Sequence, residues 1–220
     1  MVLNVRRFSE QMAVDAAANL DASVEHCPGW SVRDLVLHIG EVQRFWVRIV
    51  TERLTARPTN FERGLPSEAQ PIDWFRSQTA ALVSVLSTCA DDVAVWTWWD
   101  AEQNAGWVKR RQMNEVVVHA WDAANAVGNA EPIPADVAMV GLTEFVDVFS
   151  RDVREGAEPP PVALVATDCD WSGVLFSDDA TVVPSLELRG TASELLLSLW
   201  GRVPVIDPVL RTALRAIDLS

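Results

Sequence analysis

Three polar side chains interrupt an otherwise apolar segment in the middle of the chain. The segment follows Asn114 and spans residues 115–124, and Glu115, His119 and Asp122 occupy positions i, i+4 and i+7 within it. Residues at this spacing lie on one face of a helix. Since a buried carboxylate needs a polar partner, we expect a helix whose narrow polar stripe faces something polar inside the protein.

His38 is the second residue that points to chemistry. The chain has only three histidines, at positions 26, 38 and 119, and His38 lies within the apolar segment LVLHI. In an antiparallel bundle, the helices that carry His38 and His119 can face each other. Two histidines with Glu115 form a ligand set typical of Zn²⁺ or another divalent metal. Three protein ligands leave one metal position open, which is typical of a catalytic rather than a structural site.

Asp122 follows His119 by three residues, about one helical turn. It is expected to accept a hydrogen bond from the His119 ring or from a bound ligand. It is also the one obvious general base if a metal-bound water were to hydrolyse a substrate. Without a metal, simpler interpretations remain: an ion pair between Glu115 and His119, and a hydrogen-bonded core histidine at position 38.

Cysteine and tryptophan offer further candidates. Cys27 is adjacent to His26, and a cysteine paired with a histidine can act as a thiolate nucleophile. However, adjacent side chains on an extended segment point apart. A closed metal site with His26 or Cys27 as a fourth ligand would indicate a structural role. Trp96, Trp98 and Trp99 are predicted either to line a pocket or to pack in the core.

The first two thirds of the sequence carry helical patterns. Ser31 with Asp34 predicts a variant capping box at the start of the helix that carries His38. Gly128 is expected to end the helix that carries His119. The predicted helices span residues 9–22, 32–54, 72–90, 107–127 and 134–154.

The pattern changes at residues 155–161, where a Glu-Gly pair and three consecutive prolines indicate a domain boundary. We therefore predict two domains, residues 1–155 and 156–220, and an α+β fold that is mostly α. Beyond the boundary, β-branched runs predict strands, and a Thr191–Glu194 capping box predicts a helix. The strands span residues 162–167, 171–177 and 181–188, and the helices cover residues 195–200 and those after Pro208.

Composition limits the classes of partner. The chain has 220 residues, 49% of them hydrophobic, and a net charge of −13, which disfavours nucleic acid and anionic membranes. No apolar run reaches the roughly 18 residues of a membrane span. Three scattered cysteines make no disulfide framework, and charged residues stand where a secretory leader would be apolar. We expect a cytoplasmic monomer or homodimer that binds small molecules.

Two motifs resemble a known family. The segment CPGWSVRDLVLHIG, residues 27–40, is similar to the "PGW-S/T-V-x-D-L-x-x-H" motif of the actinobacterial DinB-like, mycothiol-dependent maleylpyruvate isomerase family. The segment EVVVHAWD, residues 115–122, resembles the second motif of that family. The order of predicted elements also matches over nearly the whole chain. The resemblance implies a DinB-like four-helix bundle followed by a small α/β domain related to sterol carrier folds.

The resemblance also implies functional residues. The zinc ligands of the family map onto His38, Glu115 and His119, its following aspartate onto Asp122, and a functional arginine of the C-terminal domain onto Arg202. An enzyme of this kind would use a metal and mycothiol, or a similar thiol, for isomerisation or S-transfer on a small electrophile, with Arg202 pairing with a substrate carboxylate. A non-catalytic metal- or ligand-binding module and a metal-dependent hydrolase are the alternatives.

Overall fold

The computed structural model describes residues 1–61, 64, 69–177, 179 and 181–218. The chain divides into two compact units, Met1–Glu131 and Pro132–Ser220. The first is helical, and the second combines helices with a small sheet, as the sequence predicts. Within the described ranges, no helix is both long enough and apolar enough to cross a membrane.

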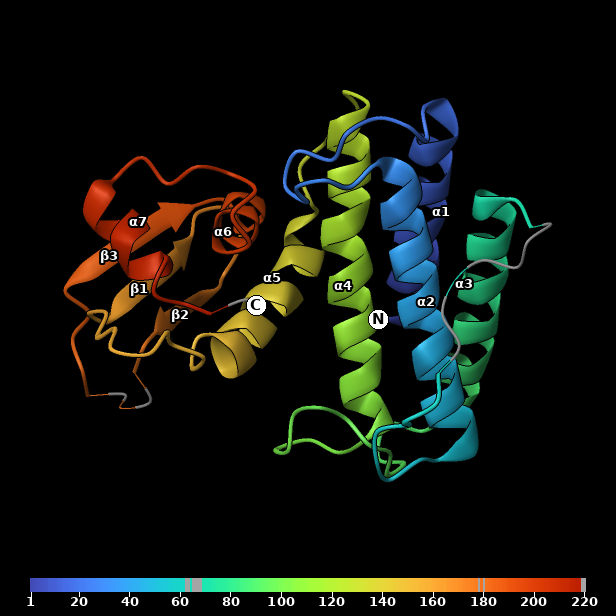
Figure 1. Cartoon of the computed structure of the whole chain (residues 1–220). Helices are drawn as coiled ribbons and strands as arrows, with labels where there is room; N and C mark the ends of the chain where they lie inside the picture. Colours follow the sequence, from blue (N-terminus) through green and yellow to red (C-terminus); the bar gives the residue numbers. More distant parts are fainter. Residues whose placement is uncertain (62–63, 65–68, 178, 180, 219–220) are drawn as a thin grey trace. The chain divides into compact units, whose positions relative to one another are not determined.

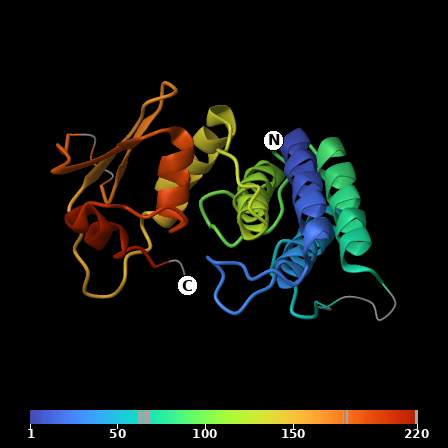
Figure 2. The same cartoon turned by 90° about the horizontal axis from the view of Figure 1, so that it is seen from above.

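The first unit is a bundle of four helices. They are α1 (Val2–Ala18), α2 (Val32–Glu52), α3 (Pro71–Thr88) and α4 (Ala105–Ala126). The helix α2 packs against both α3 and α4, and α1 packs against α3 and α4 (Figures 1 and 2). Four predicted helices are therefore present. However, α1 begins at residue 2 rather than 9, because Val5 extends the buried stripe formed by Met12 and Ala16.

Close backbone packing fixes α2 against α3. A Cβ atom at Gly40 would lie 2.2 Å from Cζ3 of the buried Trp74 ring, so only glycine fits there. One turn further along α2, the buried side chain of Gln43 accepts a hydrogen bond from Thr79 Oγ1 (2.8 Å) and donates one to Ser9 Oγ (3.1 Å). These contacts hold α2 in a defined position relative to α1 and α3, and α2 carries His38.

Local capping fixes the start of α2. The Ser31 side chain accepts from the backbone N–H of Asp34, and the Asp34 side chain accepts from the backbone N–H of Ser31, so the predicted capping box is confirmed. Just before it, the Val24 N–H donates to the Trp30 carbonyl (2.9 Å), and the Trp30 N–H donates to the Cys27 carbonyl (2.9 Å). This hydrogen-bonded loop leads directly into the helix that carries His38.

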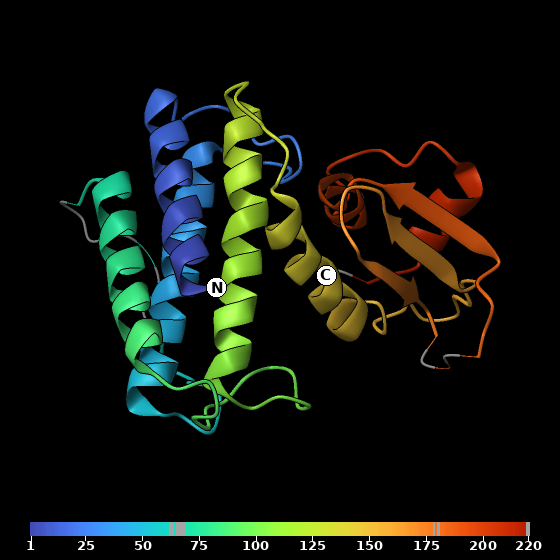
Figure 3. The same cartoon turned by 180° about the vertical axis from the view of Figure 1, so that it is seen from behind.

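The second unit is built on a three-stranded sheet in the order β2-β1-β3 (Figure 3). The strand β1 pairs antiparallel with β2 and parallel with β3. The helix α6 packs on β1 and β3, and the predicted capping box at its start is present. The elements are α5 (Ala135–Glu144), a π-helical turn η1 (Phe145–Phe149), β1 (Val162–Ala166), β2 (Ser172–Leu175), β3 (Leu186–Gly190), α6 (Ala192–Leu199) and α7 (Pro208–Leu214).

The third strand is shifted from its predicted position over residues 181–188. Asp179 accepts hydrogen bonds from the backbone N–H and the hydroxyl of Thr181, and its carbonyl accepts from the N–H of Val182 (3.0 Å). These bonds form a turn where the sequence predicts a strand. Pro184, which has no N–H to donate, delays sheet pairing further, and β3 starts at Leu186.

The division between the units differs from the predicted boundary after residue 155. It lies between Glu131 and Pro132, so α5 belongs to the second unit. The reason is that α5 packs against α6, and the Ile133 N–H donates to the buried Ser193 Oγ (2.9 Å). The proline-rich segment after residue 155 instead leads into β1.

Candidate metal centre

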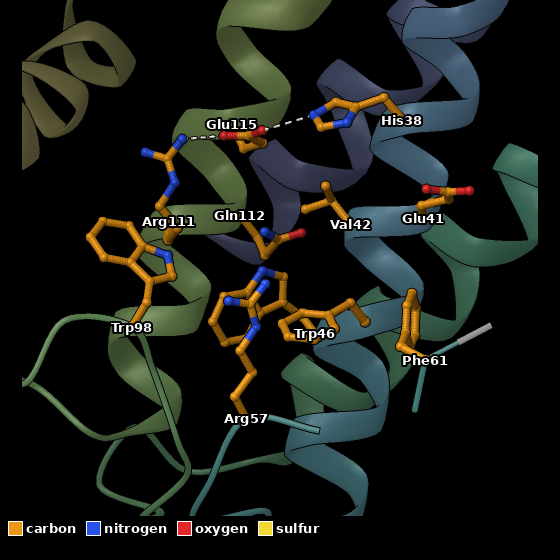
Figure 4. Close-up of a pocket in the computed structure, with 11 residues that line it drawn as sticks. His38, Glu41, Val42, Trp46, Arg57, Phe61, Trp98, Arg111, Gln112 and Glu115 are labelled. Atoms are coloured by element: carbon orange, nitrogen blue, oxygen red, sulfur yellow. Dashed lines mark hydrogen bonds and ion pairs between the residues drawn. The ribbon is translucent and has the colours of Figure 1, made fainter. Parts of the chain in front are cut away.

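His38, Glu115 and His119 come together between α2 and α4. One ligand atom from each lies within 4.8 Å of the other two. His38 Nε2 is 3.5 Å from Glu115 Oε1, and His119 Nε2 is 3.7 Å from the same oxygen. Figure 4 shows His38 reaching toward Glu115 from the opposite helix. The sequence predicted that Glu115 and His119 share a helical face, and packing brings His38 to that face.

The two oxygens of Glu115 have different partners. Oε2 accepts a hydrogen bond from Arg111, one turn earlier on α4, while Oε1 faces both histidines. Burial by itself would raise the pKa of Glu115. The positive charge of Arg111, the hydrogen bond with His38 and the charge of His119 outweigh burial and hold the pKa of Glu115 well below its ordinary value. Glu115 is therefore a carboxylate with one oxygen directed at the histidines.

Asp122 orients His119. Its Oδ2 lies 3.0 Å from His119 Nδ1, and its side chain is fully buried. A carboxylate accepts, so Nδ1 carries a proton, and Nε2 is the ring nitrogen that faces Glu115 Oε1. This is the carboxylate–histidine arrangement that accompanies metal-ligating histidines. Asp122 does not belong to the His38 group, and its contact with His119 is that of a positioning residue.

Cys27 and Asp122 form a second group of possible ligands with His119. A ligand atom from each of Cys27, His119 and Asp122 falls within 4.8 Å of the other two. This second group shares His119 with the first but contains neither His38 nor Glu115. Across the described part of the chain, three is the largest number of possible ligands in either group. His26 instead packs against Trp121, with ring centroids 5.9 Å apart.

The donor set of the His38 group fits a tetrahedral metal. Ligands bound to zinc at about 2.0–2.1 Å and tetrahedral angles lie about 3.3–3.4 Å from one another. The His38–Glu115 and His119–Glu115 separations of 3.5 Å and 3.7 Å are close to this value. Two imidazoles and one carboxylate are also ligands that zinc prefers. The residues present can therefore hold a divalent metal without a large rearrangement.

A hollow of about 280 Å³ extends from this group along α2 and α4, with His38 and Glu115 at one end (Figure 4). Its polar lining includes Gln112 and Arg57, which sequence analysis did not single out. Arg111 and Gln112 precede Glu115 by four and three residues, so helical spacing could have identified them as neighbours. The apolar lining consists of Val42, Phe45, Trp46, Phe61 and Trp98.

Trp96 and Trp98 have the two roles that the sequence predicts, one in the core and one at the hollow. Trp98 lines the hollow and is 43% exposed. Trp96 instead stacks on Trp46, with ring centroids 6.1 Å apart and planes 17° apart. One tryptophan therefore borders the site, while its neighbour stabilises the core beneath it.

Arg202 lies in the second unit, three residues after the end of α6. Its Nη1 donates to the carbonyl of Trp200 (2.7 Å), and the residue is half-buried. Its role as a substrate-binding residue stays a prediction.

Comparison with known proteins adds one decisive finding to this geometry. The family model for the mycothiol maleylpyruvate isomerase N-terminal domain matches residues 4–124. The chain belongs to this family. The matched range includes His38, Glu115, His119 and Asp122, and all of it lies in the first unit. No curated protein and no solved structure gave a significant match. The likeness of the second unit to sterol carrier folds stays a prediction.

Proposed function

We propose that this protein is an enzyme that binds a divalent metal, zinc by preference, through His38, Glu115 and His119. It would use mycothiol or a similar low-molecular-weight thiol for isomerisation of, or S-transfer to, a small electrophilic substrate. The convergence of the three donor atoms at one end of a hollow carries this proposal. Membership of the mycothiol maleylpyruvate isomerase family supports the choice of thiol.

The residues around the site have distinct tasks in this proposal. A metal bound there would lower the pKa of a coordinated thiol, so that thiolate is available at neutral pH. Arg111 keeps Glu115 ionised and engages one of its oxygens, so that the other stays available as a ligand. Asp122 keeps the His119 proton on Nδ1 and thereby leaves Nε2 available. The aromatic walls of the hollow would give a bound substrate a partly apolar surrounding.

Burial of Asp122 favours thiol chemistry over hydrolysis. A hydrolase needs a general base that can reach a water molecule at the metal. The Asp122 side chain has no exposed surface and already accepts a hydrogen bond from His119. Three protein donors leave room for an exogenous ligand, which favours a catalytic site over a purely structural one.

Metal analysis of the purified protein tests the proposed site. We expect near-stoichiometric zinc in the wild type and loss of zinc in His38→Ala and His119→Ala. The matched control is His26→Ala, which removes the third histidine but no proposed ligand and should retain zinc. Circular dichroism establishes that each variant is folded. Absence of metal even after zinc is added back, or full retention in both ligand variants, would refute the site.

Cobalt substitution then tests the use of a thiol. Cobalt(II) in a thiolate complex has a charge-transfer absorption band, and we expect this band to appear when mycothiol is added to the cobalt protein. A stoichiometric metal site with no spectral response to thiols would instead support a non-catalytic module or a hydrolase. Hydrolysis of activated ester substrates in the absence of thiol would identify the protein as a hydrolase.

We also propose a cytoplasmic location and small-molecule partners, with no role in nucleic-acid binding. The supporting observations are the charge of −13 and the three cysteines, none of which forms a disulfide. Size-exclusion chromatography with light scattering distinguishes a monomer from a homodimer.

A further inference from the structure

The second unit has a pocket of its own, with a volume of about 720 Å³. It is formed by α6, α7, the segment between them and the segment after η1. Its volume falls within the range of about 300–1,000 Å³ that is typical of sites for small organic molecules. The aliphatic part of its lining consists of Leu199, Val203, Pro204, Val205, Leu214 and Ile217. This lining suits the aliphatic part of a ligand.

Three arginines line the same pocket. Arg211 lies on α7, and Arg215 follows one helical turn later, directly after the end of α7. Arg154 comes from the segment after η1, and its backbone N–H donates to the Ala216 carbonyl (2.8 Å). This bond holds Arg154 beside the end of α7. The fold therefore gathers guanidinium groups from two distant parts of the chain around one pocket.

No described carboxylate is among the lining residues. Within the described ranges, none of the three arginines forms a salt bridge, and their side chains bond only to backbone carbonyls. Arg154 Nε donates to the Ile217 carbonyl (3.4 Å), and Arg211 Nη2 donates to the Ile206 carbonyl (3.3 Å). The Asp207 carboxylate accepts from two backbone N–H groups at the start of α7. The pocket thus has positive charges in its lining and no described negative charge among them.

This clustering of arginines runs against the composition of the unit. Residues 132–220 contain fourteen acidic residues, six arginines and no lysine, yet half of these arginines line one pocket. Glu155 and Asp218 are adjacent to lining residues in the chain but are not part of the lining. Like charges one turn apart on a helix repel each other. A bound anion would offset this repulsion and accept charge-assisted hydrogen bonds from the guanidinium groups.

We propose that the pocket of the second unit binds an organic phosphate with a short aliphatic body. A phosphate monoester carries nearly two negative charges at neutral pH and has three terminal oxygens, so it can bind several guanidinium groups at once. A carboxylate offers one charge and two oxygens. The body of the ligand would lie against the aliphatic lining. The site uses no residue of the proposed metal centre and does not depend on the proposed function.

Calorimetric titration of the full chain with n-hexyl phosphate tests the proposal, after chelation so that no metal can bind the phosphate. We expect saturable binding and a rise in Kd of about tenfold in Arg215→Gln, as for loss of a charge-assisted hydrogen bond. Arg215 is exposed, so the variant should fold. The matched control is Arg189→Gln, which removes the same charge from an exposed position on β3 and should leave Kd unchanged. Equal Kd values in Arg215→Gln and the wild type would overturn the site.

Two further ligands test the chemical class. Methyl phosphate, which has the phosphate without the longer body, should bind at least about tenfold more weakly, because it buries fewer methylene groups. Heptanoate, which has an aliphatic body but a carboxylate in place of the phosphate, should also bind about tenfold more weakly. Equal binding of methyl phosphate would overturn the aliphatic assignment, and equal binding of heptanoate would overturn the phosphate assignment.

Arg57→Gln tests where the ligand binds. Arg57 lines the hollow of the first unit, so its replacement should leave Kd unchanged. A rise in Kd in Arg57→Gln without one in Arg215→Gln would place the ligand in the first unit and overturn the proposal. Vesicles that contain phosphatidic acid distinguish a soluble phosphate from a lipid headgroup. Sedimentation with these vesicles that requires Arg215, without binding of hexyl phosphate, would overturn the small-molecule site.

Discussion

Arg111 binds Glu115 through Oε2 of the carboxylate, one turn apart on α4, and so leaves Oε1 to face the two histidines. Both side chains are mostly buried, with 9% and 19% of their surface exposed. The arginine thus neutralises a carboxylate that burial alone would tend to protonate, and it also determines which oxygen is available. The proposed metal site depends on this pair before any metal is bound.

Replacing Arg111 should make zinc binding more sensitive to acid. In Arg111→Met, burial still raises the pKa of Glu115 while the largest opposing influence is gone, so the pKa should rise. Zinc must then displace a proton from Glu115 at mildly acidic pH, which it need not do in the wild type. Calorimetry at pH 5 in buffers of different ionisation enthalpy should show more protons released per zinc in the variant.

The neighbouring Arg110→Met is the matched control for that experiment. Arg110 binds Glu102 (3.0 Å) rather than Glu115, so its loss should leave proton release as in the wild type. Equal proton release by Arg111→Met and the wild type would show that Arg111 does not govern the ionisation of Glu115.

Glu115→Gln should lower the stability of the metal-free protein in a pH-dependent way. The folded-state pKa of Glu115 lies below its ordinary value of 4.5, so ionised Glu115 contributes stability above pH 4.5 that is lost as the pH falls toward the folded-state value. At pH 7 we expect a decrease of about 1–3 kcal/mol in the free energy of unfolding, because Arg111 loses its partner. Urea unfolding should show this deficit shrinking below pH 4.5.

Glu102→Gln serves as the control, because it breaks a more exposed ion pair between Arg110 on α4 and Glu102 in the connection that precedes α4. Its deficit should be at most about 1 kcal/mol. A deficit in Glu115→Gln that is constant from pH 7 to pH 3 would contradict the predicted linkage.

Asp122→Asn should weaken zinc binding while all three proposed ligands remain. An amide can present its N–H₂ to His119 Nδ1, which would favour the tautomer that protonates Nε2. We expect zinc affinity to fall about 10–100-fold, the usual effect of losing such a partner, as measured by competition with a chelating dye. Asp73→Asn, an exposed carboxylate on α3, should keep wild-type affinity. Unchanged affinity in Asp122→Asn would remove Asp122 from the site.

Gly40→Ala should destabilise the bundle without touching the proposed ligands. The added Cβ would lie 2.2 Å from the Trp74 ring, and Trp74 is only 7% exposed, so the ring cannot simply swing into solvent. Overpacking of this kind costs about 1–3 kcal/mol, measurable by urea unfolding. Trp74→Phe in the same chain should relieve part of the clash. If the double variant loses as much free energy of unfolding as the two single variants together, the clash with Trp74 is not the cause of the destabilisation.

Sequence patterns predicted the features that lie within single helices or at their ends. Helical periodicity placed Glu115, His119 and Asp122 near one another, because residues three and four apart on a helix are neighbours. The Ser31–Asp34 and Thr191–Glu194 capping boxes were predictable for the same reason, since a cap uses atoms only three residues apart. The β-branched residues nevertheless predicted the third strand too early in the chain. The turn at Asp179 and the missing N–H of Pro184 delay the start of β3 to Leu186.

Contacts between atoms of different elements depend on the packing of the folded chain and could not be predicted from local patterns. His38 reaches Glu115 because Gly40 and the Gln43 hydrogen bonds fix the position of α2, and no local pattern gives that distance. Likewise, the hollow needs walls from α2, α4 and two connections that are far apart in sequence. The assignment of α5 to the second unit also depends on packing against α6. Spacing along one helix follows from its fixed period, whereas contacts between elements depend on how every packed side chain fits.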